Sequence, residues 1–136
     1  RCLVHGDYSP KNVLLGADGM WVLDYEVAHF GDPVFDLAFM LHHLLLKGVH
    51  ATSHRARLRE CSSRFLAGYR AEMRREPIDE TYLAAHVACL ALSRVHGKSV
   101  AGYLTEPERQ RTTELCAGLL REPVPSVDQA WGRLDG

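Results

Sequence analysis

The chain changes character at Gly31-Asp32-Pro33, and this change constrains its fold more than any other feature. Before it, two short apolar runs, Val13-Leu14-Leu15 and Trp21-Val22-Leu23, flank Gly16-Ala17-Asp18-Gly19, whose composition favours a tight hairpin turn. After it, apolar residues recur at helical spacing. The sequence therefore predicts an α+β fold, in which a small β-hairpin is followed by a mainly α-helical bundle.

The helical part begins with a segment that is apolar almost all round, as in a buried helix, and Gly48 is expected to end it. The next helix is amphipathic, and the fourth opens with a capping-box pattern at Thr105. The tail after the fourth helix is predicted to be less regular. The four helices are expected at about 34–47, 53–75, 79–96 and 105–121.

Composition and charge exclude several classes of partner. The net charge of −1 gives no electrostatic reason to bind nucleic acid or an anionic membrane. The longest apolar run, 34–46, is interrupted by Asp36 and two histidines, and it is shorter than the roughly 20 residues that a membrane span needs. We therefore expect a cytoplasmic protein that binds neither nucleic acid nor membrane.

Cysteines and most histidines show no metal-ligand spacing. The four cysteines are far apart and are expected to be buried free thiols in a reducing compartment. Seven of the eight histidines, all but His5, are interpreted as packing or surface residues. His42 and His43 are neighbours on a predicted helix, so we expect their side chains to point in different directions.

The candidate chemistry lies in a polar loop, His5-Gly6-Asp7-Tyr8-Ser9-Pro10-Lys11-Asn12, and at Asp24. In phosphoryl transfer, one carboxylate orients the acceptor hydroxyl and takes its proton, while an amide and a second carboxylate hold Mg²⁺ and its nucleotide. Asp7 is the candidate base, and Asn12 and Asp24 are the candidate metal and nucleotide ligands. Each residue alone also fits a turn that bonds its own backbone, but the three together favour the functional interpretation.

Four further residues near these candidates each fit more than one interpretation. Glu26 fits a metal ligand, direct or through water, or a solvent-exposed side chain. Lys11 fits a catalytic partner of the transferred phosphoryl group or a solvated lysine. His5 fits a catalytic base, although a structural role that fixes Asp7 is favoured. Asp36, at the start of the buried helix, is expected either to accept hydrogen bonds from the backbone amides of the polar loop or to satisfy its own first turn.

These motifs resemble the aminoglycoside phosphotransferase and choline kinase superfamily of small-molecule kinases. The resemblance lies in His5-Gly6-Asp7 to Asn12, in Leu23-Asp24-Tyr25-Glu26, and in Gly31-Asp32-Pro33-Val34-Phe35-Asp36-Leu37-Ala38. A later run, 93–99, resembles a late-helix segment of bacterial members.

The resemblance implies a protein-kinase-like C-terminal lobe with Mg²⁺, ATP or GTP as phosphoryl donor, and a small hydroxylated molecule as acceptor. It implies Asp7 as the base and Asn12 and Asp24 as metal ligands. We expect one domain, 1–136, with the catalytic and metal-binding loops in 1–33, a helical subdomain in 34–122 and a tail in 123–136.

The same resemblance implies an N-terminal lobe that carries a Gly-rich loop and an ATP-pairing lysine, and no such sequence precedes Arg1. The chain starts without Met inside an expected strand. We therefore expect a C-terminal-lobe fragment that does not turn over ATP by itself. A non-catalytic binding or scaffold remnant is the alternative, and a metal-dependent hydrolase that uses Asp7, Asp24 and Glu26 is a weaker third.

Two further features bear on the acceptor. No Ser or Thr occurs between Asp24 and Ala51, so a phosphorylated activation switch has no site there, which favours a small molecule over a protein acceptor. The predicted helix 53–75 carries more Arg than Glu, which disfavours a polycationic acceptor.

Overall fold

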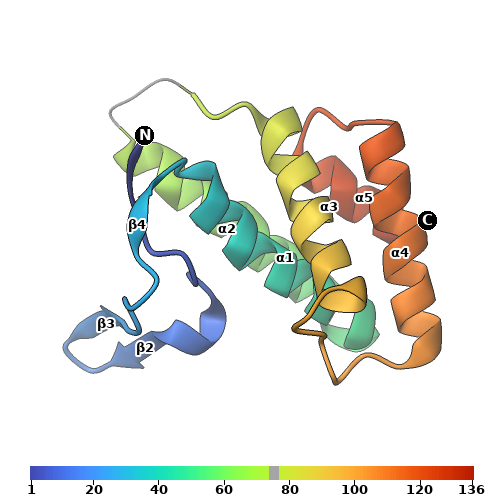
Figure 1. Ribbon diagram of the computed structural model, residues 1–136, viewed down its shortest axis with the longest axis horizontal. Coiled ribbons are helices and arrows are strands. Elements are labelled where there is room, and N and C mark those ends of the chain that lie inside the picture. The colour runs from blue at the N-terminus through green and yellow to red at the C-terminus, as the bar shows by residue number, and fades with distance from the viewer. Residues whose placement is uncertain (74–76) are drawn as a thin grey trace.

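The computed structural model describes residues 1–73 and 77–136. Within them the fold is α+β, with two small antiparallel sheets on one side of the molecule and five α-helices on the other (Figure 1). None of the helices in the described part of the chain is both long and apolar enough to cross a bilayer.

The two sheets are short and built from neighbouring segments. Strand β2 (Val13–Gly16) pairs with β3 (Gly19–Val22), and the register places Gly16 opposite Gly19. This confirms the predicted hairpin. Strand β1 (Cys2–Val4), where a strand was expected, pairs with β4 (His29–Gly31) in a second sheet. Sequence analysis did not predict β4, because a three-residue strand shows no readable alternation.

The helical part is centred on α1 (Val34–His50), which packs against α2 (Arg55–Glu72), α3 (Glu80–His96) and α4 (Glu106–Arg121). Short 3₁₀ turns at Pro10–Asn12 and Thr52–His54 precede β2 and α2. The predicted end of the second helix at Arg75 lies outside the described residues.

Two helix starts follow from their capping residues. Asp79 caps α3 by accepting a hydrogen bond from the Tyr82 amide, at 3.1 Å. Thr105 and Glu108 form the predicted capping box at the start of α4. Helix α1 contributes Leu41, Leu45 and Leu46 to the core, as its apolar pattern predicts.

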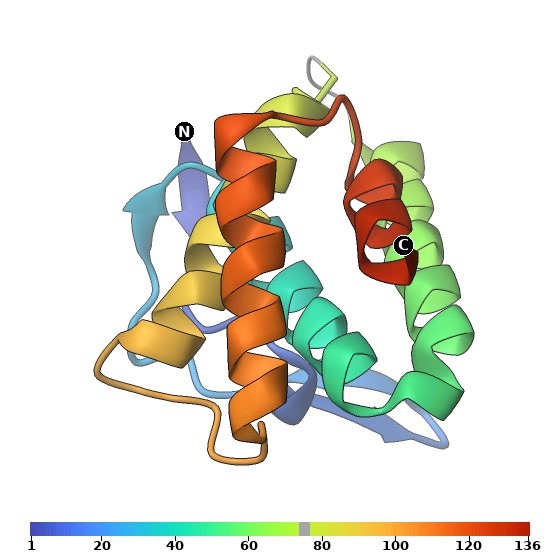
Figure 2. The ribbon, with the colours of Figure 1, turned by 90° about the vertical axis from the view of Figure 1, so that its right-hand side faces the viewer.

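The C-terminal segment differs from its prediction. Instead of an irregular tail, residues Val127–Asp135 form α5, which is capped by Ser126 and packs between α2 and α4 (Figure 2). Its Trp131 is buried, and the indole Nε1 donates a hydrogen bond to Ser62 Oγ at 3.2 Å. Sequence analysis missed this helix because nine residues give too short a window for helical periodicity.

Gly48 was predicted to end α1, but it lies inside the helix. A Cβ atom at Gly48 would clash with the Trp131 ring, so glycine at this position allows α1 and α5 to approach each other closely. Because the indole is buried and hydrogen-bonded to Ser62, it has little room to retreat. The expected stop was therefore wrong, and the glycine is explained by packing.

The contact between Gly48 and Trp131 predicts opposite results for two Gly→Ala changes in helix interiors. Gly48→Ala is expected to destabilise the chain by about 1–3 kcal/mol, since overpacking outweighs the gain in helix propensity. Gly118→Ala in α4 is the matched control, because its added Cβ would meet no atom within 4 Å; we expect it to stabilise by about 0.5–1 kcal/mol. Urea unfolding measures the change in the free energy of unfolding for both variants. Changes of the same sign would contradict the packing role assigned to Gly48.

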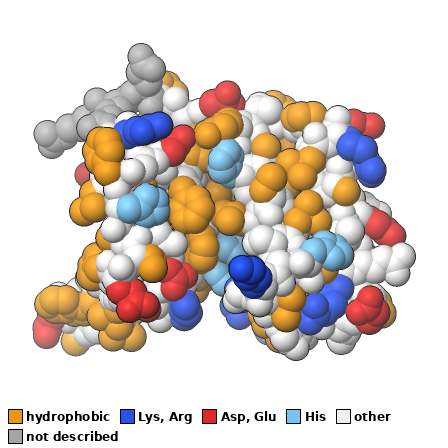
Figure 3. All heavy atoms as spheres, in the orientation of Figure 1, with side chains coloured by type: hydrophobic (Ala, Val, Ile, Leu, Met, Phe, Trp, Pro, Cys, Tyr) orange, Lys and Arg blue, Asp and Glu red, His pale blue; other side chains and the backbone are white. Residues whose placement is uncertain are grey.

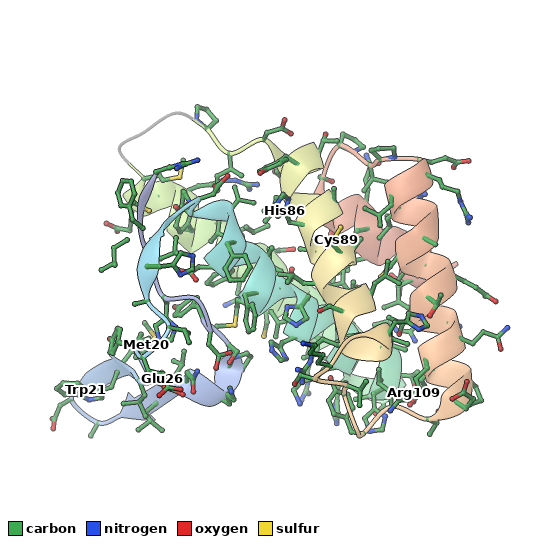
Figure 4. The ribbon with its side chains drawn as sticks, in the orientation of Figure 1. Met20, Trp21, Glu26, His86, Cys89 and Arg109 are labelled. Atoms are coloured by element: carbon green, nitrogen blue, oxygen red, sulfur yellow. The ribbon has the colours of Figure 1, made fainter. Side chains whose placement is uncertain are left out.

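The cysteines depart in part from expectation. All four are free thiols, and Cys116 is buried, which raises the pKa of its thiol to about 12. Cys61 on α2 and Cys89 on α3, however, are exposed (Figure 4 labels Cys89), so the expectation that all four are buried was wrong.

Candidate active site

The polar loop is anchored to the first turn of α1 by one carboxylate. Asp36 Oδ2 accepts a hydrogen bond from the His5 amide at 2.6 Å, and Asp36 Oδ1 accepts one from the Gly6 amide at 2.9 Å. The expectation that Asp36 binds the loop amides is confirmed. The loop therefore takes its position from the most buried helix of the molecule.

His5 fixes the loop through both ring nitrogens. Its Nε2 donates to the Leu23 carbonyl oxygen at 2.8 Å, which leaves Nδ1 as an acceptor for the Asp7 amide at 3.2 Å. The ring is buried. These bonds agree with the structural interpretation of His5, because they tie its ring to the Asp7 amide and to Leu23, the residue that follows β3.

Gly6 is required by the same turn. It has a φ of 84°, in the left-handed region that favours glycine. A Cβ atom there would lie 2.6 Å from the Val27 carbonyl oxygen. The loop thus approaches the segment after Asp24 too closely for any side chain at this position.

Asp7 is held as a carboxylate by two neighbours. Lys11 Nζ lies 2.9 Å from Asp7 Oδ2, and Asn12 Nδ2 donates to the same oxygen at 3.1 Å and to the Asp7 carbonyl at 2.9 Å. Partial burial raises the pKa of Asp7, but the hydrogen bond and charge of Lys11, together with Asn12, outweigh it and bring that pKa below its usual value. Asp7 is therefore ionised at neutral pH.

Asn12 is the backbone partner of Leu23, the residue that precedes Asp24. Its backbone carbonyl accepts a hydrogen bond from the Leu23 amide at 2.9 Å, which extends the β2–β3 ladder by one step. The Asn12 side chain is buried, and its Oδ1 has no hydrogen-bond partner among the described residues. The structure thus brings an amide oxygen with spare capacity close to the start of the Asp24 turn.

Asp24 has an unusual backbone. It is the one residue other than glycine with positive φ in the described part of the chain, at 66°. For an L-residue this conformation costs about 1–2 kcal/mol, although Asp tolerates it better than most. Such outliers cluster at functional sites, where surrounding structure holds them in place. The carboxylate is exposed at the exit of β3.

Glu26 is exposed and lies by the hairpin with Met20 and Trp21, away from α3 and α4 (Figure 4). Among the described residues, no three His, Cys, Asp or Glu side chains gather as a metal cluster. The three carboxylates that the hydrolase alternative needs, those of Asp7, Asp24 and Glu26, do not form such a group, so this alternative gains no support.

Two histidines beside the loop contradict their predicted geometry. The ring centroids of His42 and His43 lie 4.2 Å apart, so the two side chains do not point in different directions. The Phe39 ring contacts both of them. Burial lowers the pKa of His42 to about 3 and, with the charge of Arg94, that of His43 to about 4. Both imidazoles are therefore neutral at physiological pH.

A cavity of about 360 Å³ opens beside Asp7 and Lys11. Its walls also include His42 from α1, Arg94 from α3 and Lys98 from the following loop. Sequence analysis assigned no role to these three residues. The available signal was the run 93–99, noted for its resemblance to a segment of bacterial small-molecule kinases.

Comparison with known families identifies the class of protein. A model of the phosphotransferase enzyme family matches residues 1–77, which is more than half of the chain, and the chain belongs to this family. The resemblance drawn from the motifs is thereby confirmed, and phosphotransferase-type function is assigned in general terms. Searches of curated proteins and of solved structures found no match.

Proposed function

We propose that this chain is the C-terminal lobe of an ATP-dependent phosphotransferase that transfers the γ-phosphoryl group to a hydroxyl of a small molecule. The observation that carries the proposal is the placement of Asp7. Its carboxylate is ionised, is held by Lys11 and Asn12, and faces a cavity large enough for a small ligand.

The exposed apolar side chains of the β-rich part support the lobe assignment. Leu3, Leu15 and Phe30 are 75%, 83% and 70% exposed, and all lie on β1, β2 or β4. Clustered exposure of large apolar residues marks a surface that another part of a protein covers. An N-terminal lobe seated on these strands is such a cover.

In the proposed reaction, Asp7 orients the acceptor hydroxyl toward the γ-phosphorus. A bond forms between the hydroxyl oxygen and this phosphorus, and the bond to the β,γ-bridging oxygen breaks, with its electron pair leaving on ADP. The hydroxyl proton passes to Asp7 and then to solvent. Because phosphoryl transfer has a loose transition state, the main contribution of Asp7 is orientation, which a carboxylate of low pKa can provide.

Asn12 and Asp24 fit the role of Mg²⁺ ligands. Asn12 offers an amide oxygen without a partner in the described part of the chain, and Asp24 offers an exposed carboxylate at the adjoining turn. Mg²⁺ prefers such hard oxygen ligands and keeps phosphate and water oxygens for the rest of its octahedron. When bound, it would neutralise charge on the donor phosphates. Lys11, exposed and adjacent, would add positive charge near the transferred group.

The proposal is tested with the complete gene product by measuring ADP release from ATP in the presence of hydroxylated small molecules. Acceptor-dependent ADP release, with a phosphate monoester as product, is the expected result. Asp24→Asn should raise the Mg²⁺ concentration for half-maximal rate by about tenfold or more, since loss of even an indirect ligand contact costs that much. Asp18→Asn, in the exposed hairpin turn, is the matched control and should change nothing.

A folded gene product that releases no ADP with any acceptor would contradict the proposal and support the non-catalytic alternative. An unchanged Mg²⁺ requirement in Asp24→Asn would remove Asp24 from the metal site while leaving the assignment of Asp7 in place.

A further inference from the structure

The cavity beside Asp7 lies between the polar loop, α1, the C-terminal end of α3 and the loop 97–100. Figure 3 shows a hollow at this place, with Lys, Arg and His side chains along its edges. The candidate metal ligands Asn12 and Asp24 do not contribute to its walls. The cavity is therefore lined by a different set of residues from the candidate metal site.

Its charged groups are mainly basic. Asp7 is the one acidic side chain among the described residues that line the cavity, and it already pairs with Lys11. Arg94 and Lys98 remain as a surplus of two positive charges. Arg94 Nη1 donates to Ser99 Oγ at 2.7 Å, while its buried Nε has no partner among the described residues. Arg94 forms no ion pair among the described residues, so its positive charge in the cavity wall favours an anionic ligand.

His42 adds an unpaired acceptor to the same wall. Its Nδ1 donates to the Ala38 carbonyl oxygen at 3.2 Å, so Nε2 of the neutral ring carries a lone pair. The side chain is fully buried, and Nε2 has no partner among the described residues. A lone pair of this kind accepts a hydrogen bond from a donor such as a hydroxyl group and does not complement a carboxylate.

The basic wall is held in place by the loop that follows α3. The Ala101 amide donates to the Arg94 carbonyl at 2.7 Å, and Arg109 of α4 donates to the carbonyls of Ala101 and Leu104 at 3.3 Å each. A Cβ atom at Gly97 would clash with the Ser93 carbonyl oxygen, so this turn needs glycine. The loop thus presents Lys98 from a fixed backbone.

We propose that the acceptor is a small hydroxylated anion, whose carboxylate or phosphate binds Arg94 and Lys98 while a hydroxyl reaches Asp7. This inference rests on the proposed phosphotransferase function and specifies its substrate class. The same basic wall disfavours a cationic acceptor, because a second positive charge beside Arg94 would be repelled without a neutralising carboxylate.

The test is binding to the 136-residue chain without nucleotide, followed by amide chemical shifts of residues 93–101. The probes are glycerate and glycerol 3-phosphate, with neutral glycerol and cationic choline as comparisons. We expect one of the two anions to bind at least about tenfold more tightly than glycerol or choline. Comparing the two anions shows whether a carboxylate or a phosphate is preferred.

Two variants locate the binding site. Lys98→Gln and Arg94→Gln should each weaken anion binding by about tenfold, as expected for loss of a charge-assisted contact. Arg121→Gln, at the exposed end of α4, is the matched control and should leave the affinity unchanged. Lys98 is exposed, so its variant tests the site even where Arg94→Gln disturbs the fold.

Three results would overturn the inference: anion binding no tighter than that of glycerol or choline, binding insensitive to Lys98→Gln, and competitive displacement of the anion by Mg·ATP. Different results would count against the proposed phosphotransferase function and against the anionic acceptor. Anion binding at this cavity without ADP release by the complete gene product would count against phosphoryl transfer alone. ADP release with a neutral or cationic acceptor, without anion binding, would count against the anionic acceptor alone.

Discussion

Replacing Asp7 with Asn should lower kcat of the complete gene product by about 100- to 10,000-fold, the usual contribution of a positioned acid–base group. The variant keeps the size and shape of the side chain but loses the charge that orients the hydroxyl and accepts its proton. The KM for ATP should change little, because the Asn12 and Asp24 oxygens remain. Steady-state ADP release at saturating acceptor measures the effect.

The control for this variant is Asp18→Asn, which makes the same chemical change in the hairpin turn, where no catalytic role is assigned. A kcat within about threefold of wild type for Asp7→Asn would remove Asp7 as the catalytic base. A large loss in both variants would point to a general effect of charge on folding instead.

Replacing Asp36 with Ala should destabilise the chain by about 3–6 kcal/mol, since hydrogen bonds to a charged acceptor contribute about 1.5–3 kcal/mol each and two amides lose theirs. The His5 and Gly6 amides would be left without their partner beside α1. Urea unfolding measures the loss, and amide chemical shifts of the polar loop should report its release from the helix.

Asp32→Ala is the matched control. Asp32 also accepts hydrogen bonds, from the Val34 amide at 3.0 Å and from the Tyr82 hydroxyl at 3.3 Å, but the side chains of Asp32 and Tyr82 are exposed and water can replace these contacts. We expect a cost below about 1 kcal/mol there. Equal costs for the two variants would show that Asp36 does not anchor the loop more strongly than an ordinary helix-start carboxylate.

The sequence predicted those parts of the fold that depend on local interactions. The β2–β3 hairpin follows from its turn residues, and the start of α4 follows from the capping box at Thr105, because each signal acts within a few residues. The polar loop and Asp36 were also found, since their spacing is specific. Their catalytic and metal-binding roles remain predictions.

Other features depend on contact between distant segments, which a local pattern does not show. Gly48 looks like a helix end until Trp131 is known to pack against it, more than 80 positions later. Likewise, Arg94 reaches the cavity beside Asp7 and His42 only because α3 packs against α1. No window of sequence contains either contact, so local pattern could not have found them.

The left-handed conformation of Asp24 restricts which replacements this position accepts. Asn and Gly adopt positive φ with little strain, whereas branched or bulky residues do not. A single-base change from an Asp codon gives Asn or Gly, so the mutations most compatible with the turn are also those that remove its charge. The chain can therefore lose the proposed metal ligand in one mutational step while its fold persists, which is a short route from the proposed enzyme to a folded protein without chemistry.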